Sequence, residues 1–259
     1  MSSKLIEHDF NALRADYELA VRAIDAIKES DQIAVFRGGL AFQTPSEWLK
    51  FMRDRCALQH DTRHFGFSED LQHSDWWEIS NQPEKESSYA YSTTPQPFHT
   101  DNGWFARPPE INFFIMQRQA PSGGQQMVYH VGDLVADLTR EDPALLDDLA
   151  SVRVRIQKGD TGEYNDTTIL RDIDSDAPKV FWNYYRTVRS SDRIDHLCER
   201  FFTFLRAHEY APSVYELHMR DGDCFLFNDT RILHGRRAFV ASQPRERVLL
   251  QSMWKIPER

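Results

Sequence analysis

The sequence predicts a mainly β protein, a sandwich or barrel with helices packed outside it, forming one domain over residues 1–259. From about Tyr89 onward, short apolar and β-branched runs alternate with turn residues, which is typical of sandwiches and barrels. Before that point the apolar residues have helical spacing. No repeat, linker or low-complexity tract divides the chain, so a single domain is the simpler interpretation.

Residues 1–88 are predicted to contain N-terminal helices and a lid region. A helix is expected over 11–30 and a β-like run over 32–36. Thr44 and Pro45 fit the N-cap and first-turn positions of a second helix, which is expected to end near Ala57. Residues 58–96 lack periodicity, and so long an irregular stretch is usually functional or mobile.

Residues 89–259 are predicted to form the β core with two helical insertions. The expected strands cover 89–94, 97–101, 111–118, 125–131, 151–156, 167–170, 179–184, 213–218, 223–228, 232–238 and 246–255. The helical insertions are expected over 133–150 and over 192–208, and the second has a clear apolar stripe.

Composition limits the classes of function. The formal net charge of -9 and the pI near 5.6 argue against a nucleic-acid binder, although a local basic pocket can still bind a small anion. A mean hydropathy of -0.60, without any long apolar run, argues against a membrane span. Three cysteines at unrelated spacings, and a charged N-terminus, predict a cytoplasmic protein with reduced thiols. The acidity of the chain and its aromatic residues are compatible with a monomer or a homodimer.

The sharpest chemical signal is a histidine and an aspartate two residues apart, His99 and Asp101. On a β-strand such residues point to the same face, so an imidazole and a carboxylate can reach one metal ion. His234, on a late predicted strand, offers a third ligand. Two histidines and one carboxylate leave open positions on the metal, as in non-haem Fe(II) oxygenases. The His-x-Asp triplet alone is weak evidence for a metal site in a chain with ten histidines. It becomes stronger evidence when His234 and Arg247 are considered with it.

A further residue that supports this interpretation is Arg247, at the start of the last predicted strand. An arginine in a mostly apolar pocket is costly unless it meets an anion, and its planar guanidinium suits a carboxylate. The alternative interpretation is a cation at the surface or at a sheet edge.

Four segments together resemble the TauD/TfdA-like (taurine dioxygenase) family of Fe(II)/2-oxoglutarate oxygenases, which includes gamma-butyrobetaine hydroxylase and clavaminate-synthase-like enzymes. They are PFHTDNGW, APSGGQQMVY, FNDTRILHGRRAF and RERVLLQSMW, in the order of the family and within about 88–256. The resemblance implies a double-stranded β-helix (jelly-roll) core, with iron(II) held by His99, Asp101 and His234. It also implies that Arg247 binds the distal carboxylate of 2-oxoglutarate. Gln126 would assist it, at a position where the family usually has Thr, Ser or Asn.

The implied activity consumes O₂ and 2-oxoglutarate, forms succinate and CO₂, and oxidises a small polar metabolite such as an amino acid, with hydroxylation as the simplest outcome. No catalytic residue is expected beyond the metal centre. The sequence does not distinguish hydroxylation from desaturation, epoxidation or cyclisation at the same site. Alternatives from other classes are a non-catalytic jelly-roll protein that binds a metal or ligand, and a zinc or manganese hydrolase or isomerase.

Substrate residues are expected around the metal. Strand parity places Gln251 on the face of Arg247, where taurine-type enzymes use an arginine to bind a sulfonate; its neutral amide argues against a sulfonated substrate. The other candidates are polar or aromatic residues of the lid region and of the family's mid-barrel strand: Tyr91, Gln96, Asn102, Trp104, Asn183 and Arg186. Packing or solvation is the alternative role of these residues.

Overall fold

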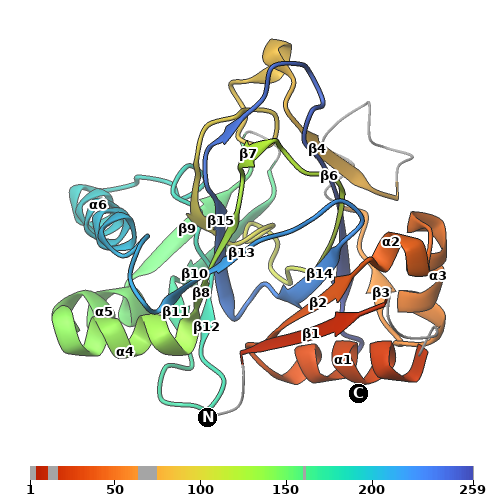
Figure 1. Ribbon diagram of the computed structural model, residues 1–259. Coiled ribbons are helices and arrows are strands. Elements are labelled where there is room, and N and C mark those ends of the chain that lie inside the picture. The colour runs from red at the N-terminus through yellow and green to blue at the C-terminus, as the bar shows by residue number, and fades with distance from the viewer. Residues whose placement is uncertain (1–3, 11–16, 64–74, 160–161, 259) are drawn as a thin grey trace.

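The computed structural model describes residues 4–10, 17–63, 75–159 and 162–258 (Figure 1). Its helices are α1 (Tyr17–Glu29), α2 (Gly39–Phe42), α3 (Pro45–Asp54), α4 (Val131–Glu141), α5 (Pro143–Ser151) and α6 (Asp192–Ala207), with a short 3-10 helix η3 (Pro83–Lys85). They lie on two sides of the molecule, with α1 to α3 on one side and α4 to α6 on the other.

Two β-sheets lie between these groups of helices. The larger sheet has the strand order β1 (Leu5–Asp9), β2 (Ile33–Arg37), β14 (Cys224–Asn228), β6 (Ile111–Arg118), β17 (Val248–Lys255) and β3 (Gln59–His60), and β4 (Trp77–Ser80) also pairs with β17. The smaller sheet has the order β13 (Val214–Leu217), β8 (Gln126–His130), β15 (Ile232–Arg236) and β5 (Gln96–His99). Three short antiparallel pairs complete the fold: β9 (Arg153–Gln157) with β10 (Tyr164–Thr168), β11 (Leu170–Arg171) with β12 (Lys179–Val180), and β7 (Ser122–Gly123) with β16 (Phe239–Val240).

The inner faces of the two sheets share one hydrophobic cluster. Phe114 and Phe225 from the larger sheet belong to it, together with Val128 and Ile232 from the smaller sheet. Separate clusters lie on the outer faces, one beneath α1 and α3 and one beneath α4 to α6. Burial of apolar surface on both faces of each sheet explains why the strands are rich in consecutive apolar residues. The prediction of a mainly β, jelly-roll core with flanking helices is confirmed.

The predicted helices differ from the observed ones in their boundaries. Thr44 caps α3 as expected, because its hydroxyl accepts from the Glu47 amide and the Glu47 carboxylate accepts from the Thr44 amide. The helix expected over 133–150 is two helices, since Pro143 begins α5 and Asp142 caps it by accepting from the amide of Leu145 at 3.0 Å. Of the helix expected over 11–30, residues 11–16 lie outside the described part of the chain.

Two predicted strands are wrong or too long. Residues 89–94 form turns, because the Arg236 guanidinium binds the carbonyl groups of Ser92 at 2.8 Å and Thr94 at 2.7 Å, so these cannot pair in a ladder. The strand expected over 179–184 ends at Val180. Its continuation turns back, with the amide of Arg186 donating to the carbonyl of Asn183 at 3.0 Å. The prediction missed β1, which pairs in parallel with β2. It also missed β4, which pairs with β17 and lies within the stretch 58–96 that was expected to be irregular.

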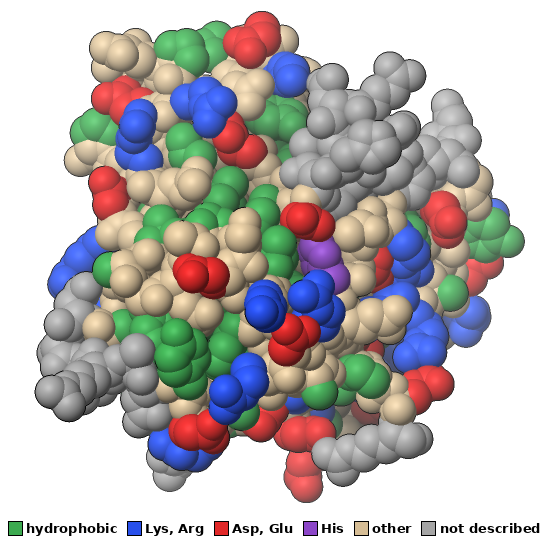
Figure 2. Space-filling view, turned by 90° about the vertical axis from the view of Figure 1, so that its right-hand side faces the viewer, with side chains coloured by type: hydrophobic (Ala, Val, Ile, Leu, Met, Phe, Trp, Pro, Cys, Tyr) green, Lys and Arg blue, Asp and Glu red, His purple; other side chains and the backbone are tan. Residues whose placement is uncertain are grey.

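The distribution of charged side chains on the surface agrees with the composition, which argued against a basic face for nucleic acid. On the face shown in Figure 2, basic and acidic side chains are interspersed and do not form a region of one sign. Among the described residues, no helix has both the length and the apolar character needed to cross a bilayer.

Candidate metal centre

Two histidines come from neighbouring strands of the smaller sheet. β5 and β15 are antiparallel, and His99 is paired directly with His234. Directly opposed residues of an antiparallel pair have adjacent side chains, and here the ring centroids are 4.2 Å apart. Gly235 permits this close approach, because a Cβ added there would lie 2.7 Å from the Gln96 carbonyl oxygen. The register of one strand pair therefore sets the position of two candidate ligands.

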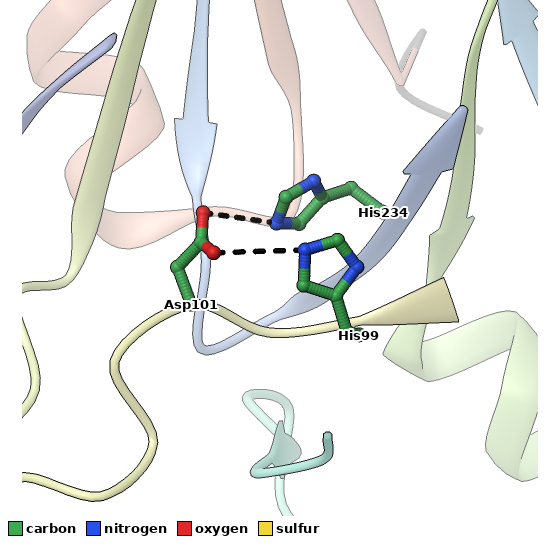
Figure 3. Close-up of side chains that lie close together, drawn as sticks. All are labelled: His99, Asp101 and His234. Carbon is green, nitrogen blue, oxygen red and sulfur yellow. Dashed lines mark ion pairs between the residues drawn. The ribbon is translucent and has the colours of Figure 1, made fainter. Parts of the chain in front are cut away.

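Asp101 lies in the bend after β5, whereas the sequence predicted it on the same strand as His99. Its amide donates to Asp229 Oδ2 at 2.7 Å, and Asn102 has a positive φ of 54°, so the chain turns toward the histidines. Asp101 Oδ1 is 3.6 Å from His99 Nε2, and Oδ2 is 3.4 Å from His234 Nε2 (Figure 3). Ligand atoms of these three residues all lie within 4.8 Å of one another.

Hydrogen bonds orient the His99 ring. Its Nδ1 is 2.9 Å from the carbonyl oxygen of Pro97, which can only accept, so Nδ1 carries the proton and Nε2 presents a lone pair to the site. The amide nitrogen of Gln96 lies 3.0 Å from Nε2 and donates to it. A metal bound at Nε2 would take the place of this amide.

Buried charges make the site favourable for a cation. Burial alone would raise the pKa of Asp101, but His234 and His99 lower it well below its usual range. Burial lowers the pKa of His234, but Asp101 and Asp229 outweigh burial and raise it to about 10. Burial raises the pKa of Asp229, and His234 opposes that shift.

The side chains at the site fit a divalent metal. His234 Nε2 is buried and makes no hydrogen bond to the described residues, although Asp229 Oδ1 lies 3.2 Å away. Two imidazole nitrogens and one carboxylate oxygen match the donor set of non-haem Fe(II) sites. These residues therefore have the donor types and the spacing that a divalent metal ion needs.

Two buried arginines line the same cavity as the candidate ligands. Arg247 is 1% exposed and Arg236 is 2% exposed, and in the described part of the chain neither forms an ion pair. Burial lowers the pKa of Arg236 to about 10, and burial together with Arg236 lowers the pKa of Arg247 to about 9. Since an unpaired buried cation is costly, the cavity favours an anionic ligand.

Gln126 lies beside Arg247. When its amide is oriented to satisfy both ends, Oε1 accepts from Arg247 Nη2 at 2.8 Å and Nε2 donates to the Gly235 carbonyl at 3.2 Å. Gly124, with a positive φ of 74°, leaves room for the arginine, because a Cβ there would lie 3.1 Å from Arg247 Nε. The structure thus brings the two predicted co-substrate residues into contact in the lining of the cavity.

Three of the predicted substrate residues lie close to the metal centre. Gln96 and Gln251 line the cavity that contains His99, Asp101 and His234. Asn183 lines an adjoining cavity that shares Gln96 and His99.

The other four predicted substrate residues line neither of these two cavities. The hydroxyl of Tyr91 accepts a hydrogen bond from the indole of Trp77. Trp77 lines the metal cavity, so Tyr91 contacts the lining of the cavity through this residue. Asn102, Trp104 and Arg186 are not among the residues that line either cavity. Asn102 is buried with its amide against Met253, Trp104 is buried beneath Lys158, and Arg186 is exposed.

Sequence reasoning missed three polar residues at the site, Arg236, Asp229 and Asn112. Arg236 is two residues after His234 on β15, so strand parity would have been enough to predict that it lies on the same face. Asp229 precedes β15 and is 2% exposed, but its approach to His234 depends on a turn. Asn112 gave no sequence signal, because it reaches Asp101 only through the packing of one sheet on the other.

Fold and site together define the class, a jelly-roll protein with a two-histidine, one-carboxylate centre beside a buried arginine pair. The profile of the family described as "Taurine catabolism dioxygenase TauD, TfdA family" matches residues 4–254. The chain belongs to this family, and the resemblance found in its four sequence segments is confirmed.

Individual relatives are distant. "Dioxygenase str8" of Strobilurus tenacellus is 25% identical over 193 residues, which cover 71% of this chain and 44% of that protein. The gamma-butyrobetaine dioxygenase of Homo sapiens is 23% identical over 177 residues, covering 64% and 45%. The chain thus spans less than half the length of these curated relatives.

Solved structures share the fold over more of their length. Asparagine oxygenase, in complex with Fe(II), 2S,3S-3-hydroxyasparagine and succinate, has a TM-score of 0.73 at 14% identity, with 98% of this chain and 94% of that chain covered. The non-heme iron oxygenase OrfP, in complex with Fe and alpha-ketoglutaric acid, has a TM-score of 0.64 at 17% identity, covering 94% and 83%. At such identities the comparison establishes the fold.

Proposed function

We propose that the protein is an Fe(II)- and 2-oxoglutarate-dependent oxygenase that oxidises a small polar metabolite. The observation that carries this proposal is the convergence of His99, Asp101 and His234 in the cavity that also contains the unpaired cation of Arg247. A metal-binding triad alone fits several chemistries. A buried guanidinium beside it adds a place for a dicarboxylate that can reach the metal with its other end.

Each side chain has a defined part in this proposal. His99, Asp101 and His234 hold Fe(II), which supplies the activation of O₂ when it is bound. Arg247 and Gln126 bind the distal carboxylate of 2-oxoglutarate and so fix the direction in which the co-substrate lies. The apolar walls formed by Phe114, Leu249 and their neighbours limit access of water to the reacting groups.

The substrate in this proposal is an amino acid or a derivative with hydrogen-bonding groups. Gln251 Nε2 donates to Asp101, which leaves its buried Oε1 without a partner among the described residues and ready to accept from a substrate donor. Gln96 lines the same cavity as Gln251, and Asn183 lines the adjoining cavity that Gln96 also borders. Hydroxylation is the proposed outcome, and desaturation, epoxidation or cyclisation would use the same side chains.

The remaining properties of the protein are also proposals. Residues 1–259 act as one domain, as a monomer or homodimer, on a small molecule and without a nucleic-acid partner. A cytoplasmic location is supported by the three buried free thiols of Cys56, Cys198 and Cys224, which suit a reducing compartment.

The test measures succinate formed from 2-oxoglutarate by the protein with Fe(II), in air and without oxygen, against a panel of free amino acids. The proposal predicts formation of succinate that needs both Fe(II) and O₂ and increases with the correct amino acid. Mass spectrometry of that amino acid then separates addition of oxygen from loss of hydrogen. Binding of metal with no succinate under any condition would favour the non-catalytic alternative. Turnover with zinc or manganese and no use of 2-oxoglutarate would favour the hydrolase or isomerase.

A further inference from the structure

Two buried amides contact the carboxylate of the candidate metal ligand Asp101. Gln251 Nε2 donates to Asp101 Oδ2 at 2.7 Å, and Asn112 Nδ2 donates to the same oxygen at 3.1 Å. The amides also contact each other, since Gln251 Nε2 lies 3.2 Å from Asn112 Oδ1. Asn112 is 2% exposed and Gln251 is 1% exposed, so bulk water does not compete for these bonds.

The two amides belong to a different sheet from the ligand that they contact. Asn112 is on β6 and Gln251 is on β17, adjacent strands of the larger sheet on which Met253 is paired with Asn112. The two residues are therefore diagonal neighbours on one face. Asp101 follows β5 of the smaller sheet. The contact fixes the bend that carries Asp101 against the opposite sheet.

The chemistry of the groups dictates the direction of each bond. An ionised carboxylate can only accept, so both amides must present their nitrogens to Asp101. One hydrogen of Gln251 Nε2 then points to Asp101, and the other is available to Asn112 Oδ1. The charge of the carboxylate strengthens both bonds, and both end on Oδ2. Oδ2 also lies 3.4 Å from His234 Nε2, and Oδ1 lies 3.6 Å from His99 Nε2.

We propose that Gln251 and Asn112 form an amide brace that positions Asp101: by holding Oδ2, the two amides fix the rotation of the carboxylate relative to His99 and His234. This inference rests on the metal site of the proposed function. It gives Gln251 a positioning role through its nitrogen, separate from any contact of its oxygen with substrate. Partners of metal ligands typically contribute about 10–100-fold to metal affinity.

The experiment titrates metal-free protein with Co(II), a redox-stable probe, by calorimetry and by visible absorption, without 2-oxoglutarate or substrate. Gln251→Met removes the donor and keeps an unbranched side chain of similar length. We expect about 10–100-fold weaker Co(II) binding and a changed Co(II) absorption spectrum, because the carboxylate is free to rotate. Gln251→Leu and Asn112→Leu are further variants with the same expectation. Circular dichroism selects the variants that fold.

Ser252→Ala is the matched control. Ser252 is the next residue on β17, is fully buried, and accepts from the indole of Trp254 at 3.0 Å, away from Asp101. We expect this variant to lose some thermal stability and to bind Co(II) as the native protein does. A general loosening of β17 would weaken Co(II) binding in Ser252→Ala and Gln251→Met alike, and that result overturns the brace.

Asp101→Ala separates the brace from the function on which it rests. If Asp101→Ala loses Co(II) binding while a folded Gln251→Met keeps native affinity and spectrum, the metal site stands and the brace is wrong. If Asp101→Ala binds Co(II) as well as the native protein, the metal site itself is wrong, and the brace with it.

Discussion

His99 and His234 occupy directly paired positions on β5 and β15, and the centroids of their rings are 4.2 Å apart. Beside them, Gly235 lies so close to the backbone of β5 that an added Cβ would be 2.7 Å from the Gln96 carbonyl oxygen. The distance between these candidate ligands is set by how closely the two backbones approach. A larger residue at position 235 is therefore expected to alter the spacing of His99 and His234, although Gly235 itself has no side chain that could contact the metal.

Gly235→Ala tests this coupling. A Cβ at this position would meet the Gln96 carbonyl oxygen at 2.7 Å and the Met127 methyl at 3.0 Å, so the strands must separate. We expect a loss of about 1–3 kcal/mol in the free energy of unfolding, as in other overpacked sites, together with weaker metal binding. Urea unfolding and Co(II) titration measure the two effects. The control is Gly132→Ala on α4, where the nearest atom to a new Cβ is 4.0 Å away, and both quantities should stay close to native.

His99→Ala and Asp101→Ala each remove one candidate ligand. Both variants should fold, because His99 and Asp101 form no part of the hydrophobic clusters, and both should lose metal binding and succinate formation. Circular dichroism, Co(II) titration and the succinate assay check the three expectations. Native turnover in either variant would remove the metal assignment.

Arg247→Ala should mainly weaken the binding of the co-substrate 2-oxoglutarate. Loss of a charge-assisted pair of hydrogen bonds costs about 1.5–3 kcal/mol, so the KM for 2-oxoglutarate should rise on the order of 10–100-fold with a smaller change in kcat. Gln126→Ala should raise the KM less, since it removes one neutral contact to Arg247. Arg193, an exposed arginine of α6, gives the control Arg193→Ala with native kinetics. An unchanged KM in Arg247→Ala would place the co-substrate anchor elsewhere.

Asp61 predicts a pH dependence of stability. It is 5% exposed, and although burial raises the pKa of Asp61, hydrogen bonds from Arg63 and the charge of Lys255 lower it below the ordinary 3.8. Its amide also donates to the Met253 carbonyl at 2.8 Å, which ties β3 to β17. Because the folded-state pKa is below the unfolded value, the stabilisation is complete above the unfolded pKa and is lost as pH falls through the folded pKa.

Asp61→Asn should therefore lower the free energy of unfolding by about 1–2 kcal/mol near neutral pH. The difference from the native protein should shrink as the pH falls below the ordinary 3.8 and through the lowered pKa of the folded Asp61 carboxyl, because the native side chain then becomes protonated as well. Urea unfolding curves at several pH values measure it. A difference that grows at low pH would contradict the sign of this argument.

Much of the site was predictable because its signals are local. Short stretches of sequence contain the His99-to-Asp101 spacing, the parity of Arg247 and Gln251 on one strand, and each of the four family segments. The parity prediction agrees with the cavity, which both Arg247 and Gln251 line. The turn at residues 89–94 was not predictable, because the group that holds it, Arg236, lies more than a hundred residues away.

The sequence by itself determined the donor types and most of the pattern of strands, since these depend on residue identity and on a periodicity of two. The burial of Arg247 was decided by the tertiary structure. Only the tertiary structure decided that His234 faces His99, that Asp101 reaches them from a bend, and that Gln251 turns its nitrogen to Asp101. The physical reason is that register and sheet-on-sheet packing are fixed by contacts between residues far apart in the chain. No local pattern encodes which of those contacts form.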